Sequence, residues 1–276
     1  MFPKLTREYF RRAGLWLVLL AIAPPVAATP EEESRQIWDT SLKPVYFADR
    51  AITEGAPQII IELTAPPKAE DPALVPISIH TKIPQTDDAF IQKIYVFIDK
   101  NPLPLVGTFA FTPASGRADL AMRIRIDDRS YVRAIAEMNT GELYMDERFV
   151  RAVGGCSAPP GKDLAESMAR LGKIKIRILG EIQQGEPSLT QLMISHPNIT
   201  GLAMDQVRRM KPPPYFVKEI RVSFDGQPVL SAETTFAISQ NPSFRFFFVP
   251  HQDGELTVEV IDTKEERFTS SYSVRL

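Results

Sequence analysis

The chain has 276 residues, 44% of them hydrophobic and 24% charged, with a formal net charge of −2. These values are typical of globular proteins and exclude the disordered and collagen-like classes. The 24 prolines against 14 glycines favour many turns and edge strands over long helices. The length suits one large domain or two modest ones, each burying its own core.

Residues 1–28 have the order of parts of a secretory signal peptide. A basic head with Arg11-Arg12 precedes an apolar run of 11 residues, 13–23, which is far short of the roughly 20 that span a bilayer. Val26-Ala27-Ala28 fits a cleavage site before Thr29. We predict cleavage there and export to the periplasm, by the Sec or the twin-arginine route, with no membrane span left in the mature chain. An uncleaved N-terminal anchor is the alternative.

Removal of residues 1–28 leaves 28 basic and 33 acidic residues, a net charge of −5. An acidic chain of this kind is a poor nucleic-acid binder, so proteins or small molecules are the expected partners. Cys156 is the one cysteine in the chain. In an exported protein a single cysteine forms an intermolecular bond or remains a free thiol.

The first half of the chain after the signal peptide predicts a short helix at 31–38 and then strands. Runs rich in β-branched and aromatic residues predict these strands at 58–65, 75–80, 91–99, 105–111, 120–126, 131–137 and 142–153. Many of the runs alternate in polarity, as a sheet with one buried face requires. Seven short strands at this spacing predict an immunoglobulin-like antiparallel β-sandwich.

The second half repeats the pattern after a short helix. Asp163 is expected to cap this helix, LAESMARL, and Gly172 to end it. Strands are predicted at 173–179, 188–195, 215–224, 228–233, 243–249, 255–262 and 267–276, with a tight hairpin at Asp225-Gly226. The expected organisation is a signal peptide at 1–28, a sandwich at 29–160, a linker at 161–172 and a second sandwich at 173–276. The fold class is therefore all-β, two immunoglobulin-like sandwiches in tandem.

No pattern in the sequence indicates turnover or a resident cofactor. The three histidines, His80, His196 and His251, lie far apart and lack metal-site spacing. There is no nucleophile elbow and no phosphate-binding or dinucleotide fingerprint. Asp127-Asp128 suggests a solvated surface, and Asn198-Ile199-Thr200 matches a glycosylation acceptor only weakly. We therefore expect that the chain is not an enzyme.

The loop around Cys156 suggests an accessible thiol rather than a core cysteine. Gly154 and Gly155 let the chain turn before the sulfur, and two prolines and Gly161 follow it. Such a loop could reach into the active site of a partner. Arg151 and Lys162 flank it and could lower the pKa of the thiol. Spacing alone leaves a carrier thiol and a disulfide-linked homodimer equally open.

Several segments resemble the SoxY and SoxZ families of bacterial sulfur oxidation. The first sandwich resembles SoxY through NPLPLVGTFAFTP, RIRI, YVRAIAEMNTGELY and VGGCSAPPG. The second resembles SoxZ through ISHPNITGL (194–202) and ISQNPSFRFFF (238–248). Together the resemblance covers nearly all of the mature chain, which looks like the fused SoxYZ-like carriers associated with quinoprotein dehydrogenases.

The resemblance implies a periplasmic carrier with a covalent sulfur cargo on Cys156. SoxY holds its substrate on the cysteine of a terminal GGCGG arm, and Gly154, Gly155 and Cys156 match its first half. The partners implied are Sox-type redox enzymes or a quinoprotein dehydrogenase, with pairing between the SoxY-like and SoxZ-like parts. Two departures matter: Ser157 and Ala158 replace the later glycines, and the thiol is not near a free C-terminus. The alternative is a non-covalent accessory module for a quinoprotein dehydrogenase.

Overall fold

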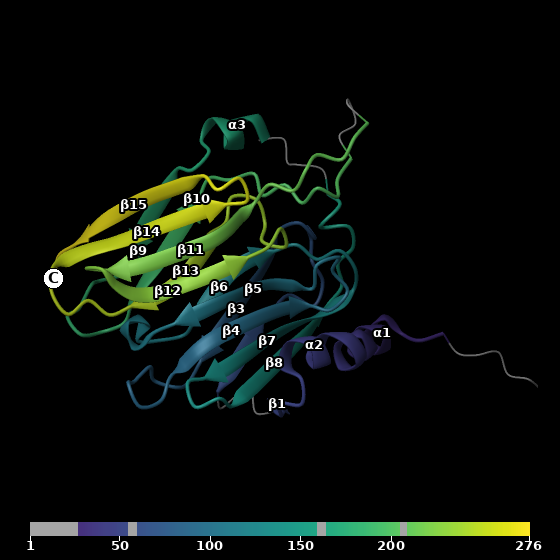
Figure 1. Cartoon of the computed structure of the whole chain (residues 1–276), viewed down its shortest axis with the longest axis horizontal. Coiled ribbons are helices and arrows are strands. Elements are labelled where there is room, and N and C mark those ends of the chain that lie inside the picture. The colour runs from purple at the N-terminus through teal and green to yellow at the C-terminus, as the bar shows by residue number, and fades with distance from the viewer. Residues whose placement is uncertain (1–26, 55–59, 159–163, 205–208) are drawn as a thin grey trace, which may run out of the picture.

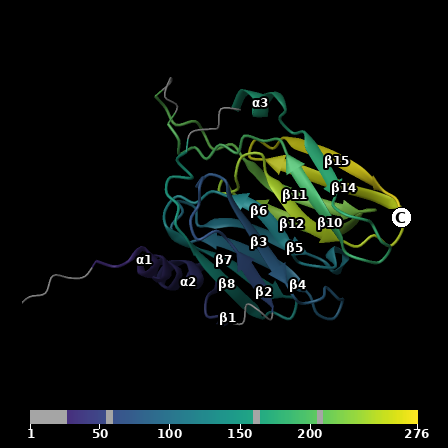
Figure 2. The same ribbon diagram turned by 180° about the vertical axis from the view of Figure 1, so that it is seen from behind.

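The computed structural model describes residues 27–276 except 55–59, 159–163 and 205–208. The described residues form fifteen strands in two stacked sheets (Figures 1 and 2). In the N-terminal half, which ends at 158, they are β1 (Ile52–Glu54), β2 (Ile61–Thr64), β3 (Val75–Thr81), β4 (Ile91–Ile98), β5 (Leu105–Phe111), β6 (Leu120–Ile124), β7 (Ser130–Met138) and β8 (Leu143–Val150). In the C-terminal half they are β9 (Ile174–Ile178), β10 (Ser188–Ile194), β11 (Val217–Phe224), β12 (Gln227–Thr234), β13 (Ser243–Phe248), β14 (Gly254–Asp262) and β15 (Arg267–Val274).

The predicted all-β fold is confirmed, and the helices are short. They are α1 (Pro30–Ile37), which continues through a π-helical turn, η1 (Trp38–Leu42), into α2 (Lys43–Phe47), a 3₁₀ turn, η2 (Pro113–Ser115), and α3 (Leu164–Ala169) between the halves. None of the helices in the described residues is long and apolar enough to cross a membrane. Asp163 lies outside the described residues, as does nearly all of the predicted signal peptide.

The two halves share both sheets. The nine-stranded sheet has the order β1-β8-β7-β4-β5-β12-β11-β14-β15, and the six-stranded sheet has the order β2-β3-β6-β13-β10-β9. Strand β5 pairs antiparallel with β12, and β6 meets β13 where Ala121 faces Arg245. The tandem sandwiches are therefore joined edge to edge into one two-layered structure. A single core cluster runs through both halves, with Phe109 and Phe244 in ring contact at 6.1 Å across the join.

Alternating burial explains why these segments form strands. Residues of β10 alternate regularly between buried and half-buried, and β6 does the same. The hairpin between β11 and β12 turns at Asp225-Gly226, where both residues have positive φ, 47° and 78°. A two-residue turn of that geometry matches the twist of paired strands. The sequence missed β1, a three-residue edge strand that runs parallel to β8.

The N-terminal helices cover the first four strands of the nine-stranded sheet through a second, smaller core. Thr29 caps α1 with a capping box, and Trp38, Leu42 and Phe47 pack against side chains of β4, β7 and β8. Beneath them Arg133 holds Asp99 by two hydrogen bonds of 2.9 Å, from Nε and Nη2. Both side chains are almost fully buried, and burial raises the pKa of Asp99 despite the neighbouring guanidinium.

We expect Arg133→Met to lower the free energy of unfolding by about 3–5 kcal/mol, because it leaves the Asp99 carboxylate buried without its cation. Urea unfolding followed by tryptophan fluorescence measures the change, since Trp38 stacks 4.7 Å from the Arg133 guanidinium. Arg221→Met is the control, because Arg221 makes its ion pairs on the exposed surface and its removal should change stability little. Equal losses in the two variants would contradict a buried pair.

Candidate functional site

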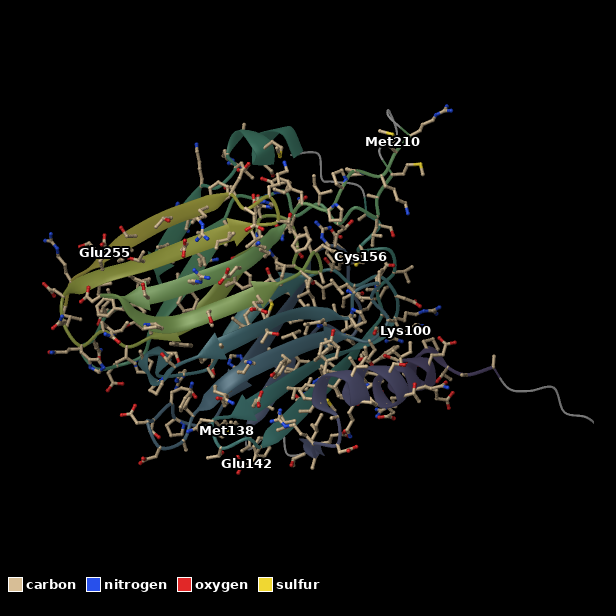
Figure 3. The ribbon with its side chains drawn as sticks, viewed as in Figure 1. Lys100, Met138, Glu142, Cys156, Met210 and Glu255 are labelled. Atoms are coloured by element: carbon tan, nitrogen blue, oxygen red, sulfur yellow. The ribbon has the colours of Figure 1, made fainter. Side chains whose placement is uncertain are left out.

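Cys156 is fully buried, at the end of the sandwich where the two halves meet (Figure 3). The loop after β8 folds back onto the end of β6. The Gly154 N–H donates to the Asp127 carbonyl at 2.7 Å, and the Gly155 N–H to the Ile126 carbonyl at 2.9 Å. The expectation of an exposed thiol is therefore wrong for this state, because two backbone bonds dock the loop.

The glycine before the cysteine is required by close packing. A Cβ on Gly155 would collide with the carbonyl oxygen of Pro72 and lie 2.5 Å from that of Ile126. Gly154 has a φ of +83°, in the region that favours glycine, with open space around its Cα. These two glycines, predicted to give the loop freedom, here allow it to dock. Gly161 lies outside the described residues.

Each half of the chain satisfies one backbone polar group of Cys156. The Cys156 N–H donates to Asp127 Oδ1 at 3.1 Å, from the N-terminal half. The Thr200 hydroxyl donates to the Cys156 carbonyl at 2.7 Å, from the C-terminal half. Asp127 was expected on a solvated surface, and the structure instead makes it an acceptor for the thiol loop. Docking therefore needs both halves.

Arg125 places a buried guanidinium beside the thiol. Its Nη2 donates to the Asn198 carbonyl at 3.2 Å and its Nη1 reaches the Gly155 carbonyl at 3.5 Å, while Nε has no hydrogen-bond partner within the described part of the chain. Among the described residues no carboxylate forms an ion pair with it. Burial lowers the pKa of Arg125, and the nearby Cys156 thiol opposes that effect. A buried cation with an unused donor suits an anionic group on the sulfur.

The docked thiol is chemically quiet. Burial, and then the negative charge of Asp127, raise the pKa of Cys156 to about 12, and Arg125 opposes the rise. At that pKa only about one thiol in 10⁵ is ionised at neutral pH. Because the thiolate is the nucleophile, the thiol becomes reactive only when the loop leaves this position.

Arg125 takes the place that the sequence suggested for Arg151. Arg151 is exposed beside Lys68 and does not contribute to the pKa shift of the thiol. Lys162 lies outside the described residues. Alternation along RIRI would turn Arg123 and Arg125 to the same outer face, but β6 ends at Ile124 and Arg125 points inward. No local pattern predicts that reversal.

The buried His196 fixes the conformation of the segment 196–200, which carries the Thr200 hydroxyl that holds the loop. The His196 Nδ1 accepts the Asn198 N–H at 3.1 Å, so the proton of the neutral ring lies on Nε2, which faces Asp262 Oδ2 at 3.6 Å. Burial lowers the pKa of His196 despite Asp262. Asn198 is itself fully buried and accepts the Val217 N–H. The weak glycosylation pattern therefore coincides with a structural asparagine.

Two family models assign the chain to the SoxY and SoxZ class. The family model described as sulfur oxidation protein SoxY matches residues 45–156, and the model described as sulphur oxidation protein SoxZ matches residues 176–273. The chain therefore belongs to the SoxYZ-like proteins, in which a SoxY domain is fused to a SoxZ domain. No curated protein matches the chain significantly.

Two solved structures are similar to parts of the chain. The sulfur carrier protein SoxY from Chlorobium limicola f thiosulfatophilum is 24% identical over 44% of this chain and 98% of its own, with a TM-score of 0.36. The superoxide reductase (neelaredoxin) from Ignicoccus hospitalis is 16% identical over 36% of this chain and 94% of its own, with a TM-score of 0.32. In the part of the chain that the structure describes, no group of three or more His, Cys, Asp or Glu side chains could hold a metal ion.

Proposed function

We propose that the protein is a periplasmic carrier that holds a sulfur compound covalently on Cys156 for partner redox enzymes. One observation carries the proposal: the loop with the one thiol of the chain is held at the junction of the SoxY and SoxZ domains by a few hydrogen bonds. Such contacts are weak enough to break without unfolding either domain. Docking protects the thiol, and release exposes it to a partner. The chain would carry no turnover of its own.

The chemistry of loading a sulfur compound fits alternate docking and release of the loop. Released into water, the thiol regains a pKa near 8.5 and becomes a few per cent thiolate at neutral pH. Joining it to the outer sulfur of thiosulfate forms one S–S bond and releases the thiol proton and two electrons. A partner redox enzyme takes up those electrons. If the loaded loop returns, the nearby buried guanidinium of Arg125 would pair with the anionic cargo.

The alternative is a non-covalent accessory module for a quinoprotein dehydrogenase. The buried, un-ionised state of Cys156 favours it, because a thiol held in this way takes part in no chemistry. In that case Cys156→Ser should bind the dehydrogenase as well as the wild type. Under the carrier proposal, the partner should pass no sulfur to that variant.

We expect Cys156→Ser to lose all covalent cargo and to keep the fold. The measurement is intact mass of protein isolated from the native periplasm without reductant, and again after reduction. The wild type should carry a reducible adduct on the Cys156 peptide, and its mass identifies the cargo. Ser157→Ala is the control that leaves the sulfur in place. A bare thiol under every growth condition, or a mass of twice the chain from a disulfide homodimer, would refute the carrier.

A further inference from the structure

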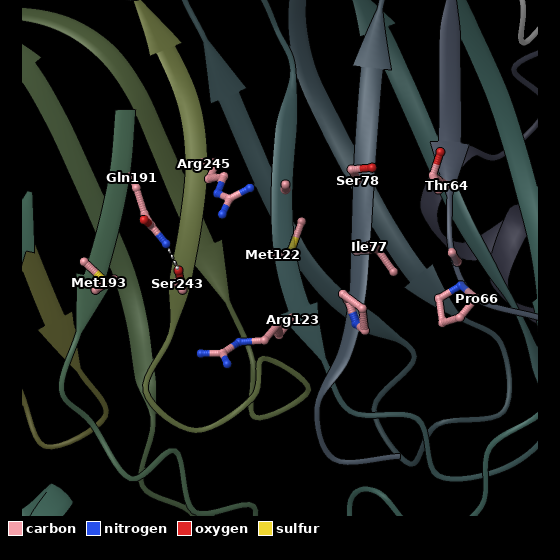
Figure 4. A pocket seen from close by; sticks show the side chains of 13 residues that line it. Thr64, Pro66, Ile77, Ser78, Met122, Arg123, Gln191, Met193, Ser243 and Arg245 are labelled. Atoms are coloured by element: carbon pink, nitrogen blue, oxygen red, sulfur yellow. Dashed lines mark hydrogen bonds between the residues drawn. The ribbon is translucent and has the colours of Figure 1, made fainter. Parts of the chain in front are cut away.

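The outer face of the six-stranded sheet is hollowed into a groove of about 780 Å³ (Figure 4). It crosses the join between the halves, with side chains from β2, β3 and β6 on one side and from β13 and β10 on the other. The residues that give it its character are Ser78, Arg123, Gln191, Met193, Ser243 and Arg245. A groove of this size takes a ligand of many atoms rather than a single inorganic ion.

All the charge in the groove lining is positive. Arg123 and Arg245 are its charged residues, and no carboxylate lines it. Arg123 donates to the Asn241 carbonyl at 3.3 Å. Arg245 is exposed and makes no ion pair or side-chain hydrogen bond with the described part of the chain. Neither guanidinium forms an ion pair with the described part of the chain, so both are available to bind a carboxylate in the bidentate geometry that arginine favours.

The neighbouring edge strand extends the positive face. Lys175 and Arg177 on β9 are exposed and pair with Met193 and Gln191, so they lie on the same face as the groove. Two acidic residues share this face: Glu62 on β2, three strands away from Arg245, and Asp119 just before β6, whose carboxylate is paired with His80 at 3.2 Å. This concentration of cations stands out on a chain whose net charge is −2. It complements an acidic partner.

The uncharged lining suits an extended polypeptide. The Gln191 Nε2 donates to the Ser243 hydroxyl at 3.3 Å, which leaves the amide oxygen of Gln191 facing the groove (Figure 4). Ser78 and Thr64 add hydroxyls, and Met193 adds an adaptable apolar surface. The polar groups of the lining can form hydrogen bonds with the backbone of an extended peptide, and the apolar groups between them can contact its side chains.

We propose that this groove binds an acidic segment of a partner protein, with carboxylates of the segment on Arg123 and Arg245. The site lies on a sheet face, whereas Cys156 lies at the end of the sandwich, so a partner bound there leaves the thiol loop accessible. The inference does not depend on any cargo on Cys156. A bilayer surface is the competing anionic partner, and it fits a concave sheet face poorly.

The test is fluorescence anisotropy of a labelled oligo-glutamate peptide titrated with the full mature chain at low and at physiological ionic strength. We expect saturable binding that weakens at least about tenfold in Arg123→Ser/Arg245→Ser, because each lost charge-assisted contact costs roughly that factor. The control Arg221→Ser/Arg267→Ser removes the same charge from the other sheet, where both arginines pair with Glu259. It should bind as the wild type does.

A second variant separates shape from charge. Ala121→Phe fills the middle of the groove, beside Arg245, and keeps both guanidiniums. We expect it to weaken peptide binding as well, with an unchanged circular dichroism spectrum. Unchanged affinity in this variant, equal losses in both arginine pairs, or binding to phosphatidylglycerol vesicles without binding to the peptide would each overturn the proposal.

Discussion

Gly155→Ala is expected to release the Cys156 loop and to raise the rate of thiol modification by a factor on the order of 10³. The added Cβ meets backbone carbonyls of Pro72 and Ile126, which cannot turn aside as a flexible side chain would. The loop must leave, and the pKa of its thiol falls from about 12 towards the value of an exposed cysteine. The measurement is the rate of reaction with 4,4′-dithiodipyridine at neutral pH in the full chain.

Gly141→Ala is the matched control for this experiment. Gly141 lies in the turn between β7 and β8 with a φ of +100° and open space around it, so alanine strains the backbone there without touching the thiol loop. It should leave the modification rate unchanged. Thr200→Val should raise the rate in the same direction as Gly155→Ala, because it removes the hydroxyl that holds the Cys156 carbonyl. If Gly155→Ala reacted no faster than wild type, the docked loop would not control the thiol.

Acid is expected to release the same loop through His196. Protonation puts a hydrogen on Nδ1, which then faces the Asn198 N–H, and two donors cannot share that contact. The segment that follows must shift, and it carries the Thr200 hydroxyl that holds Cys156. Burial lowers the folded-state pKa of His196 below its ordinary 6.5. Docking is therefore complete above about pH 6.5 and is lost as the pH falls through the lower, folded-state pKa.

The charged and titratable groups around His196 set how far this pKa falls. Asp262 raises the pKa and Lys264 lowers it, and the Tyr215 ring packs 4.6 Å from the His196 ring. Burial outweighs the Asp262 carboxylate, so the pKa of His196 is lowered overall. The neutral ring is then the resting form at neutral pH, with its Nδ1 as acceptor.

The measurement for His196 is the disulfide-exchange rate of Cys156 divided by that of a free cysteine, from about pH 8 to about pH 5. The ratio should rise on acidification in the wild type. In His196→Asn it should stay low at every pH, because the amide oxygen takes the place of Nδ1 and does not titrate. His251→Asn, which replaces an exposed histidine, should behave as the wild type. A flat ratio in the wild type would contradict the switch.

The strands could be predicted from the sequence because their signal is local. Alternating polarity and β-branched residues located fourteen of the strands to within a few residues, and Asp225-Gly226 located the hairpin. The short β1 escaped because three residues give no period, and its stability comes from pairing with β8. How the halves join was also beyond the sequence, since the pairing of β5 with β12 depends on register between distant segments.

The sequence singles out Cys156 as the candidate residue, but it does not indicate what surrounds it. Cys156 stood out as the one cysteine between glycines and prolines, but glycine permits a tight fit as readily as a mobile loop. What decides between them is the position of Ile126, Asp127 and Thr200, which lie 29 or more residues away from Cys156 along the chain. Arg125 was missed because its inward turn follows the end of β6, where alternation no longer applies.

The shared sheets make the docking of the thiol loop independent of dilution. If the SoxY and SoxZ parts were separate chains, Thr200 would dissociate from the loop at low concentration, and the Cys156 carbonyl would lose its hydrogen-bond donor. Here strand pairing in both sheets holds the two parts in one folded unit. The effective concentration of Thr200 around the Cys156 loop is therefore fixed by the fold. Each thiol therefore has its own protecting site, in a ratio that expression levels cannot change.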